Sequence, residues 1–304
     1  MTLSPSFVDR LAGGEVLVAD GATGTNYQEA GLPLGIAPEE WVESEPDRVL
    51  ALHRAFIDAG ADIILTDSFG GTSLRLQEAS LADRARELNR RAAELARDAA
   101  ASRPGVLVAG SMGPTGMLMA PLGELTAPTA ADAYAEQAAG LTEGGADLLL
   151  LETFFALDEA LAAIEGVRRT SELPLVVSFS FDQGTRTMMG LRPTEMVDAV
   201  RPLGLAAVGA NCGRSLDDME KVVTELVRAA PGIPLWIKPN AGLPRMDGDT
   251  ASYDTTPAMM AEYASRFIRS GAQVVGGCCG TSPEHLRAIV RAAGTSLRIT
   301  QLGV

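Results

Sequence analysis

The sequence predicts one α/β domain, residues 1–304, folded as a single (β/α)8 TIM barrel. Eight short runs rich in Val, Leu, Ile and Ala alternate with longer helical patterns, as in parallel strands joined by crossover helices. Three segments, DAGADIILT, EGGADLLLLE and RSGAQVVGG, place a glycine suited to a helix C-cap before an apolar strand. Eight βα units without an interruption long enough for a second domain favour a closed barrel over an open doubly wound sheet.

The strands are predicted from continuous apolar runs, which are typical of strands buried on both faces. In chain order they span residues 16–20, 62–66, 106–110, 147–151, 174–180, 206–210, 234–238 and 273–277. Helical patterns between them, several opening on a proline, serine or threonine suited to a helix start, span residues 46–59, 81–102, 130–143, 157–169, 215–230 and 256–270. The longest predicted connections are 21–45, 111–128 and 240–254.

Composition excludes several classes of partner. The 25 Lys and Arg against 39 Asp and Glu give a formal charge of -14, and this acidic surface should repel nucleic acid and anionic lipid. No apolar run approaches the ~18 residues of a membrane helix, and no basic stretch followed by an apolar one opens the chain. We therefore expect a cytoplasmic protein. Three cysteines, two of them adjacent, suit a metal or a reactive thiol better than a disulfide framework.

In a closed barrel the residues that follow each strand meet at one rim, where the active sites of such barrels lie. Here those segments hold the polar and sulfur chemistry: DGATG, TDSFG, SMGPTG, ET, FD, NCG, PNAG and CCGT. All three cysteines are among them, Cys212 after the sixth predicted strand and Cys278 and Cys279 after the eighth. The two histidines, His53 and His285, belong to helical segments and are expected to be surface or packing residues.

The three cysteines are the candidate metal ligands. A single cysteine is more typical of a small buried packing residue. These three, however, all follow strands and are flanked by glycine in GANCGRS and GGCCGTSPEH, which lets a ligand approach the backbone. Three thiolates with one open position suit a catalytic zinc ion, which keeps a bound thiol deprotonated yet nucleophilic. The sequence thus predicts Zn²⁺ on the catalytic residues Cys212, Cys278 and Cys279.

Several motifs resemble the homocysteine S-methyltransferase family over about residues 16–292: VADGATGT, GADIILTDSFGG, GSMGPTG, APLGEL, GGADLLLLET, GANCG, IKPNAGLP and GGCCGTSPEHLRAI. They are most like the homocysteine-binding barrel of cobalamin-dependent methionine synthase. The resemblance implies the same three-cysteine zinc site, with the incoming thiol as a further ligand. It also implies that Asn240, in the PNAG turn, lies near the zinc when substrate is absent.

The resemblance also implies a set of substrate-binding residues. Asp20 and Glu152 would hold the substrate ammonium, which carboxylates attract at close range. Both residues end apolar strands, where burying a charge is costly unless it has a partner. Gly21 and the turn from Thr66 to Ser68 would lie near the substrate carboxylate. Asn211, in the GANCG motif, is a further implied substrate-binding residue. Two departures stand out: TDSFGG replaces an asparagine and a threonine of many relatives, and Thr153 replaces the tyrosine of betaine-using enzymes.

These features imply a small-molecule thiol acceptor, most simply homocysteine giving methionine. In-line attack on an electrophilic methyl group needs little acid-base help. The donor stays open between a methyl-corrinoid on a separate protein and a small compound such as S-methylmethionine. Residues that can line the mouth, or simply fill gaps in the core, are Tyr27, Trp41, Phe154, Met112, Met117, Met119, Met188 and Met189.

Two other functions compete with this interpretation. Lys238 ends the seventh predicted strand, and a strand-end lysine in a barrel can form a Schiff base, as in lyases. Alternatively, the zinc is structural and the protein is a non-catalytic component of a methyltransferase complex. A structural site would require four permanent protein ligands, and the sequence offers three cysteines.

Overall fold

The computed structural model describes residues 5–33, 35–247 and 250–301. Its central sheet contains eight parallel strands in the order β1-β10-β7-β6-β5-β4-β3-β2. Their bounds are β1 (Leu17–Val18), β2 (Ile63–Leu65), β3 (Leu107–Met112), β4 (Leu148–Phe154), β5 (Leu175–Phe179), β6 (Ala207–Cys212), β7 (Leu235–Pro239) and β10 (Ala272–Val275). All eight predicted strands are confirmed.

The sheet closes on itself between β1 and β2. Ala19 forms a parallel bridge with Ile63, and the backbone N–H of Asp20 donates to the Ile63 carbonyl at 2.9 Å. Two carboxylates extend this seam: Asp62 accepts from the N–H of Val18 at 2.9 Å, and Asp20 accepts from the N–H of Leu65 at 2.7 Å. The fold is therefore a (β/α)8 TIM barrel, as predicted.

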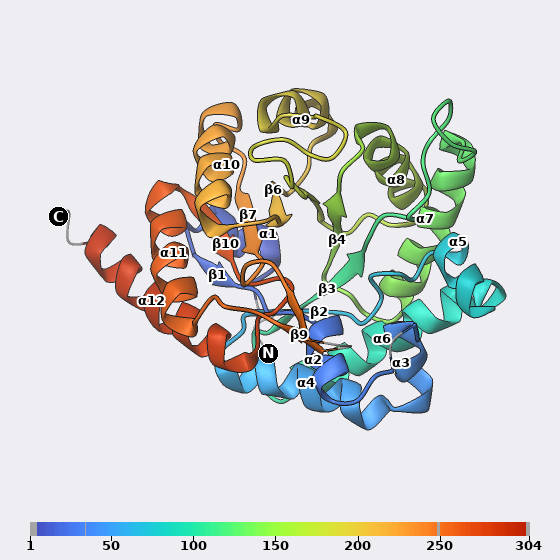
Figure 1. Cartoon of the computed structure of the whole chain (residues 1–304), viewed down its shortest axis with the longest axis horizontal. Coiled ribbons are helices and arrows are strands. Elements are labelled where there is room, and N and C mark those ends of the chain that lie inside the picture. The colour runs from blue at the N-terminus through green and yellow to red at the C-terminus, as the bar shows by residue number, and fades with distance from the viewer. Residues whose placement is uncertain (1–4, 34, 248–249, 302–304) are drawn as a thin grey trace.

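A helix follows each barrel strand, and these helices form a ring around the sheet (Figure 1). Their bounds are α4 (Pro46–Ala59), α6 (Ala85–Ala100), α7 (Ala127–Glu143), α8 (Leu157–Thr170), α9 (Pro193–Val200), α10 (Leu216–Ala229), α11 (Pro257–Ser270) and α12 (Pro283–Gln301). The six helices predicted by range are confirmed with small shifts at their ends, and α12 is the helical segment expected at His285. The α9 helix was not predicted, because eight residues are too few for a clear helical period.

Local sequence explains where these helices begin and end. The hydroxyls of Thr126, Ser215 and Thr256 cap α7, α10 and α11 by accepting a backbone N–H of the first turn. The helices α4 and α11 end at Gly60 and Gly271, whose φ values of 110° and 114° are left-handed. The predicted helix-to-strand turns at these glycines are thus confirmed.

Shorter elements occupy the connections. They are α1 (Phe7–Ala12), α2 (Gly24–Glu29), η1 (Pro38–Glu40), α3 (Trp41–Ser44), α5 (Ser73–Leu76), η2 (Gln77–Ala79), η3 (Ala82–Arg84), η4 (Arg201–Leu203), β8 (Arg245–Asp247) and β9 (Thr250–Ser252). The antiparallel pair β8 and β9 falls inside the segment 240–254, which the sequence predicted as a plain connection.

Two apolar regions hold the barrel together. One fills its interior with buried side chains from the strands, including Leu17, Leu107 and Trp236. The α1 helix covers the end where the strands begin, since Phe7 is buried with its ring centroid 6.3 Å from that of Trp236. The second region packs the outer faces of the strands against the helices. The open end of the barrel is therefore the one where the strands finish.

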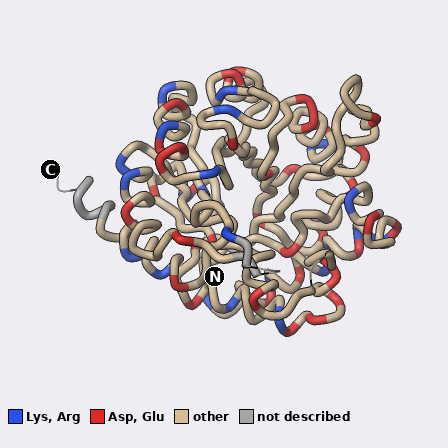
Figure 2. Tube along the Cα trace, viewed as in Figure 1, with Lys and Arg blue, Asp and Glu red and all other residues tan. Residues whose placement is uncertain are grey.

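Charged residues lie mostly on the ring of helices, with both signs interspersed (Figure 2). Ion pairs such as that between Arg86 and Glu143 link neighbouring helices on this outer surface. None of the helices in the described part of the chain combines the length and apolar character needed to cross a bilayer.

Candidate metal centre

Three sulfur atoms meet at the open end of the barrel. Cys212 is the last residue of β6, and Cys278 and Cys279 follow β10. Their Sγ atoms all lie within 4.8 Å of one another, and those of Cys212 and Cys278 are 3.1 Å apart. All three side chains are half-buried, so the cluster can be reached from the barrel mouth. Barrel closure thus brings together cysteines that are 66 residues apart in sequence.

The turn after β7 connects the two halves of this cluster, because β7 lies between β6 and β10 in the sheet. Asn240 in this turn donates from Nδ2 to the carbonyl of Gly213 at 2.9 Å. Its Oδ1 accepts from the backbone N–H of Cys279 at 3.0 Å. Both polar atoms of this side chain are therefore engaged in positioning the segments that carry the cysteines.

The backbone around the cysteines is left-handed at Cys212 and at Gly280. Cys212 has a φ of 58°, a left-handed conformation that is uncommon for a residue with a side chain. Gly280 has a φ of 77°, and a Cβ at this position would collide with the ring of Tyr253. Tyr253 comes from the connection between β7 and α11, so this ring lies directly beside the residue that follows Cys279.

The donor set fits a divalent, thiophilic metal. The 3.1 Å between two of the sulfurs is far longer than the ~2.05 Å of a disulfide, so the three are free thiols. Zinc–sulfur bonds of about 2.3 Å in a tetrahedron place sulfurs roughly 3.8 Å apart, within the span of this cluster. Hydrogen bonds from Cys212 and Cys278 lower the pKa of Cys279 to about 4. Hydrogen bonding to the other two cysteines and burial raise the pKa of Cys212 well above its usual value. A cation is therefore needed to keep all three deprotonated.

A buried charged group lies beside the sulfurs. Lys238, in β7, forms an ion pair with Asp20 across 2.8 Å, and both side chains are 2% exposed. Glu152, in β4, accepts from the hydroxyl of Ser111 at 2.5 Å. Burial raises the pKa of Glu152 to about 7, although the ammonium of Lys238 lowers it. For Lys238, burial lowers the pKa, but the carboxylates of Asp20 and Glu152 outweigh this effect and raise it.

The turn after β2 joins this group through Ser111, in β3. The hydroxyl of Thr66 accepts from the N–H of Ser111 at 2.9 Å and lies 2.5 Å from the hydroxyl of Ser68. Ser68 in turn donates to the carbonyl of Ser111 at 2.8 Å. Gly21 follows β1, and a Cβ there would lie 2.8 Å from the ring of Phe56, so only glycine fits. Thr66, Ser68, Ser111 and Glu152 thus form one network at the strand ends.

The structure separates the residues considered for the mouth into two groups. The aromatic candidates are buried in packing: the ring centroids of Tyr27 and Trp41 are 4.9 Å apart, and those of Phe154 and Tyr134 are 5.9 Å apart. Met112 and Met119 are also buried. Of the two roles left open for these five residues, lining the mouth or filling the core, their burial supports core packing. Exposed apolar residues on the connections after β3, β5 and β7 are Met117, Leu118, Leu122, Met188, Met189 and Leu243.

Both histidines have packing or capping positions rather than a place at the sulfurs. His53 is 2% exposed within α4. At the start of α12, the Nε2–H of His285 donates to the carbonyl of Thr255 at 2.9 Å, and its Nδ1 lies 2.9 Å from the hydroxyl of Ser282.

Sequence reasoning missed two features of the site. Lys238 was considered only as a Schiff-base nucleophile, although a lysine in an apolar strand requires a buried counter-ion, and Asp20 is that counter-ion. Tyr253 was not singled out, because it lies in an aperiodic connection with no motif around it. The requirement for glycine at position 280 could have signalled that a side chain approaches there.

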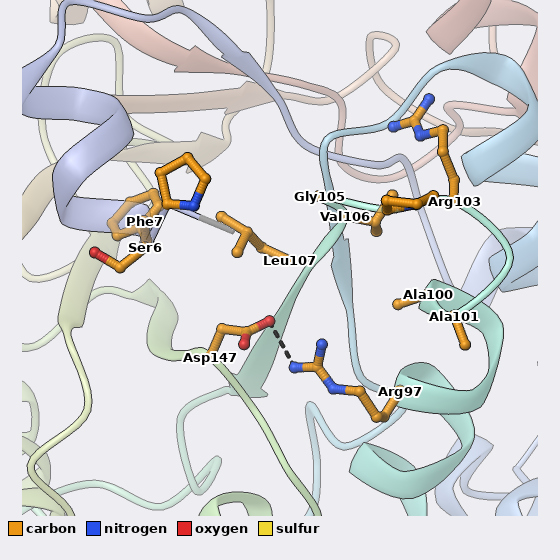
Figure 3. A pocket seen from close by; sticks show the side chains of 12 residues that line it. Ser6, Phe7, Arg97, Ala100, Ala101, Arg103, Gly105, Val106, Leu107 and Asp147 are labelled. Carbon is orange, nitrogen blue, oxygen red and sulfur yellow. Dashed lines mark hydrogen bonds and ion pairs between the residues drawn. The ribbon is translucent and has the colours of Figure 1, made fainter. Parts of the chain in front are cut away.

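A pocket at the opposite end of the barrel has different chemistry (Figure 3). It lies beside α1 and the start of β3 and is lined in part by Phe7, Leu107 and Arg103. Its prominent charges already neutralise each other, because Arg97 pairs with Asp147 across 2.6 Å. The titratable and sulfur chemistry is concentrated at the other end.

Comparison with known proteins agrees with this geometry. A family model described as homocysteine S-methyltransferase matches residues 17–293. Methionine synthase of Mycobacterium leprae (strain TN) is 36% identical over 293 residues, covering 91% of this chain and 24% of that protein. Methionine synthase of Mycobacterium tuberculosis (strain ATCC 25618 / H37Rv) is 35% identical over 299 residues, covering 93% and 25%. The chain thus spans about a quarter of the length of these relatives.

A solved structure shares the fold. The homocysteine methyltransferase MmuM from Escherichia coli, in its metallated form, superposes with a TM-score of 0.78 at 24% identity, covering 92% of this chain and 96% of that one. Fold and site together define a (β/α)8 barrel with a three-thiol cluster at its mouth. The chain belongs to the homocysteine S-methyltransferase family.

Proposed function

We propose that this protein transfers a methyl group to the sulfur of homocysteine, giving methionine, and that Cys212, Cys278 and Cys279 hold the zinc ion on which the reaction depends. The observation that carries this proposal is the cluster of three free thiols within 4.8 Å at the open end of the barrel. In the described part of the chain no further Cys, His, Asp or Glu completes a four-residue group. A fourth position is thereby left for a substrate sulfur.

When bound, zinc would keep the acceptor thiol deprotonated at neutral pH. The chain's own residues would position the rest of the amino acid. Both oxygens of Asp20 already have partners, Lys238 and the N–H of Leu65, whereas Glu152 uses one oxygen for Ser111. Glu152 is therefore the main acceptor for the substrate ammonium, and Asp20 contributes charge from behind it. The ammonium in turn would lower the pKa of Glu152 from about 7 and keep it ionised.

The turn from Thr66 to Ser68 and Gly21 would lie near the substrate carboxylate. Asn240 would maintain the arrangement of the cysteine segments through its two hydrogen bonds. In the transfer itself a lone pair of the substrate sulfur forms the new carbon–sulfur bond, while the bond from the methyl carbon to the donor breaks and the donor takes that electron pair. No proton has to move, which agrees with the absence of a histidine at the cluster.

The donor that we propose is a methyl-corrinoid held by a separate protein that docks at the barrel mouth. Six large apolar side chains are exposed on three of the connections at the mouth, and the most exposed are Leu122 at 68% and Met188 at 66%. Exposed apolar residues gathered on one face are typical of a protein-docking surface. A small cationic donor is commonly bound by an aromatic cage, and Tyr27, Trp41 and Phe154 are buried in packing.

The lyase alternative is weaker because of how Lys238 is held. A Schiff-base lysine must lose its proton to attack a carbonyl, and here burial is outweighed by two carboxylates that raise the pKa of Lys238. A non-catalytic zinc protein is weaker because the cluster provides three protein ligands, as an open site does.

The test is to purify the protein under reducing conditions, measure its zinc content, and assay methionine formation from homocysteine with methylcobalamin and with S-methylmethionine. Wild type should contain one zinc and form methionine, whereas Cys279→Ser should lose both properties. Met259→Ser removes an exposed sulfur on α11 and should change neither. A wild-type protein without zinc would overturn the metal assignment. Stoichiometric zinc without methionine from either donor would overturn the assignment of homocysteine and these donors.

A further inference from the structure

We infer that Asn211 and Thr153 direct hydrogen bonds onto the sulfurs of Cys212 and Cys278, and that these bonds make those two thiolates poorer nucleophiles than the substrate's. This inference rests on the proposed function. A site that activates one thiolate among four sulfurs has to direct the methyl group to the substrate and keep it from its own ligands. The contacts around Asn211 supply such a distinction.

The orientation of the Asn211 amide is determined by its neighbours. The side chain is fully buried at the end of β6. Its Oδ1 lies 2.8 Å from the backbone nitrogen of Thr153 and 2.7 Å from the hydroxyl of Ser178. A backbone N–H can only donate, so the atom facing it must be the amide oxygen. The amide nitrogen therefore faces the sulfurs.

Asn211 Nδ2 has three acceptors within reach. They are Thr153 Oγ1 at 2.7 Å, Cys212 Sγ at 3.6 Å and Cys278 Sγ at 3.8 Å. Nδ2 carries two hydrogens, so one goes to the threonine oxygen and the other to the sulfur pair. Because Thr153 Oγ1 accepts from Asn211, its own hydrogen is free to point at Cys212 Sγ, 3.9 Å away. Cys212 is thus approached by two donors and Cys278 by one.

Cys279 is treated differently. Within the described residues no side-chain N–H or O–H group other than those of the cluster's own thiols lies within hydrogen-bonding distance of its Sγ. Cys279 can therefore serve as an internal control, because it belongs to the same cluster but lacks these hydrogen-bond donors.

Hydrogen bonds to a thiolate slow its alkylation for a general reason. The negative charge on sulfur is lost as its lone pair forms the bond to carbon, so a donor stabilises the thiolate more than the transition state and raises the barrier. Hydrogen bonds around sulfur ligands are known to tune metal sites in this way. A substrate thiolate without such donors is therefore more reactive than the thiolates of Cys212 and Cys278.

Thr153→Val is the sharpest test. Valine keeps the branched shape of threonine, so the strain of the 65° φ at this position is common to both, while the hydroxyl is removed. Thr153→Ser restores the hydroxyl. The zinc-loaded proteins are treated with methyl iodide without homocysteine, and methylation of each cysteine is followed by peptide mass spectrometry. In this reaction sulfur bonds to the methyl carbon, and iodide leaves with the electron pair of the broken bond.

We expect Cys212 in Thr153→Val to be methylated about fivefold faster than in wild type, the factor equivalent to one hydrogen bond of about 1 kcal/mol. Cys279 should be unchanged, and Thr153→Ser should behave like wild type. Equal rates at Cys212 in all three proteins would refute the inference. Acceleration of all three cysteines together, with loss of zinc, would also refute it, because Thr153 would then be merely structural. Wild type that contains no zinc would count against the proposed function instead, since the comparison between variants needs neither homocysteine nor a biological donor.

Discussion

Replacing Lys238 with methionine removes one partner of a fully buried ion pair and keeps the apolar stem of the side chain. The ammonium lies 2.8 Å from the Asp20 carboxylate, and both side chains are 2% exposed. A buried pair broken in this way costs about 3–5 kcal/mol, because the remaining charge has no partner. Among the residues that the structure describes, the N–H of Leu65 is the one other hydrogen-bond donor to Asp20. We therefore expect a loss of this size in Lys238→Met.

The protonation of Asp20 leads to a loss of the same magnitude. Burial raises the pKa of Asp20, and Lys238 opposes that effect, so the variant should keep Asp20 protonated. Protonating a carboxyl with an unfolded pKa of ~3.9 costs about 4 kcal/mol at pH 7 and about 1.5 kcal/mol at pH 5. The sign follows from the folded pKa lying above the unfolded one: the loss is complete at high pH and disappears as the pH falls to the unfolded pKa.

Urea unfolding followed by circular dichroism, at fixed zinc and reductant, measures this loss at both pH values. Asp20→Asn combined with Lys238→Met removes both charges and should recover most of the stability. Lys221→Met is the matched control, because Lys221 also lies 2.8 Å from a carboxylate, Asp218, but on the surface, and we expect no measurable change. A loss in Lys238→Met no larger than in this control, or independent of pH, would refute the reasoning.

Three further predictions concern stability. Gly209→Ala should prevent folding because its Cβ would overlap the carbonyl oxygen of Trp236, whereas Gly294→Ala, in open space on α12, should raise the midpoint of thermal unfolding; soluble, folded Gly209→Ala would contradict this. Burial lowers the pKa of His53 to about 4, so folding stability should fall by up to about 3 kcal/mol as the pH drops from the unfolded value of ~6.5 toward 4. His53→Leu should flatten that dependence in urea titrations, and identical slopes would argue against it. Phe7→Ala should cost about 3–5 kcal/mol by uncovering the barrel floor, and a change below about 1 kcal/mol in the same titrations would show that α1 packs only loosely.

The parts of the fold that could be predicted from the sequence are those with local, repeated signals. Strands buried on both faces give continuous apolar runs, as in LVVSF of β5 and LWIKP of β7. The one charge in these runs, Lys238, reflects a partner 218 residues away, and no local pattern identifies it. The helix α9 was missed because eight residues show too little helical periodicity, and the pair β8 and β9 was missed because RMD and TAS contain no continuous apolar run.

The candidate site was predictable to the same extent. Positions at strand ends indicated where the cysteines, Glu152 and Asn240 would lie, because a closed barrel places all strand ends at one rim. The direction of an amide group was beyond sequence reasoning. Asn211 was grouped with the substrate-binding residues, whereas its contacts are with Thr153, Ser178 and two sulfurs. Such contacts depend on the exact register of β4, β5 and β6.

The seam between β1 and β2 links closure of the barrel to the charged residues of the site. The β1 strand has two residues, and a carboxylate supplies one hydrogen bond at each end of the seam, Asp62 to Val18 and Asp20 to Leu65. Of the two, Asp20 also binds Lys238 and lies beside the proposed ammonium position. A change of charge or a bound ligand at Asp20 would therefore alter the stability of the hydrogen bonds between β1 and β2. Amide hydrogen exchange at Leu65 would therefore report the state of the site, through a local opening confined to this seam, while β6, β7 and β10 with their sulfurs stay closed.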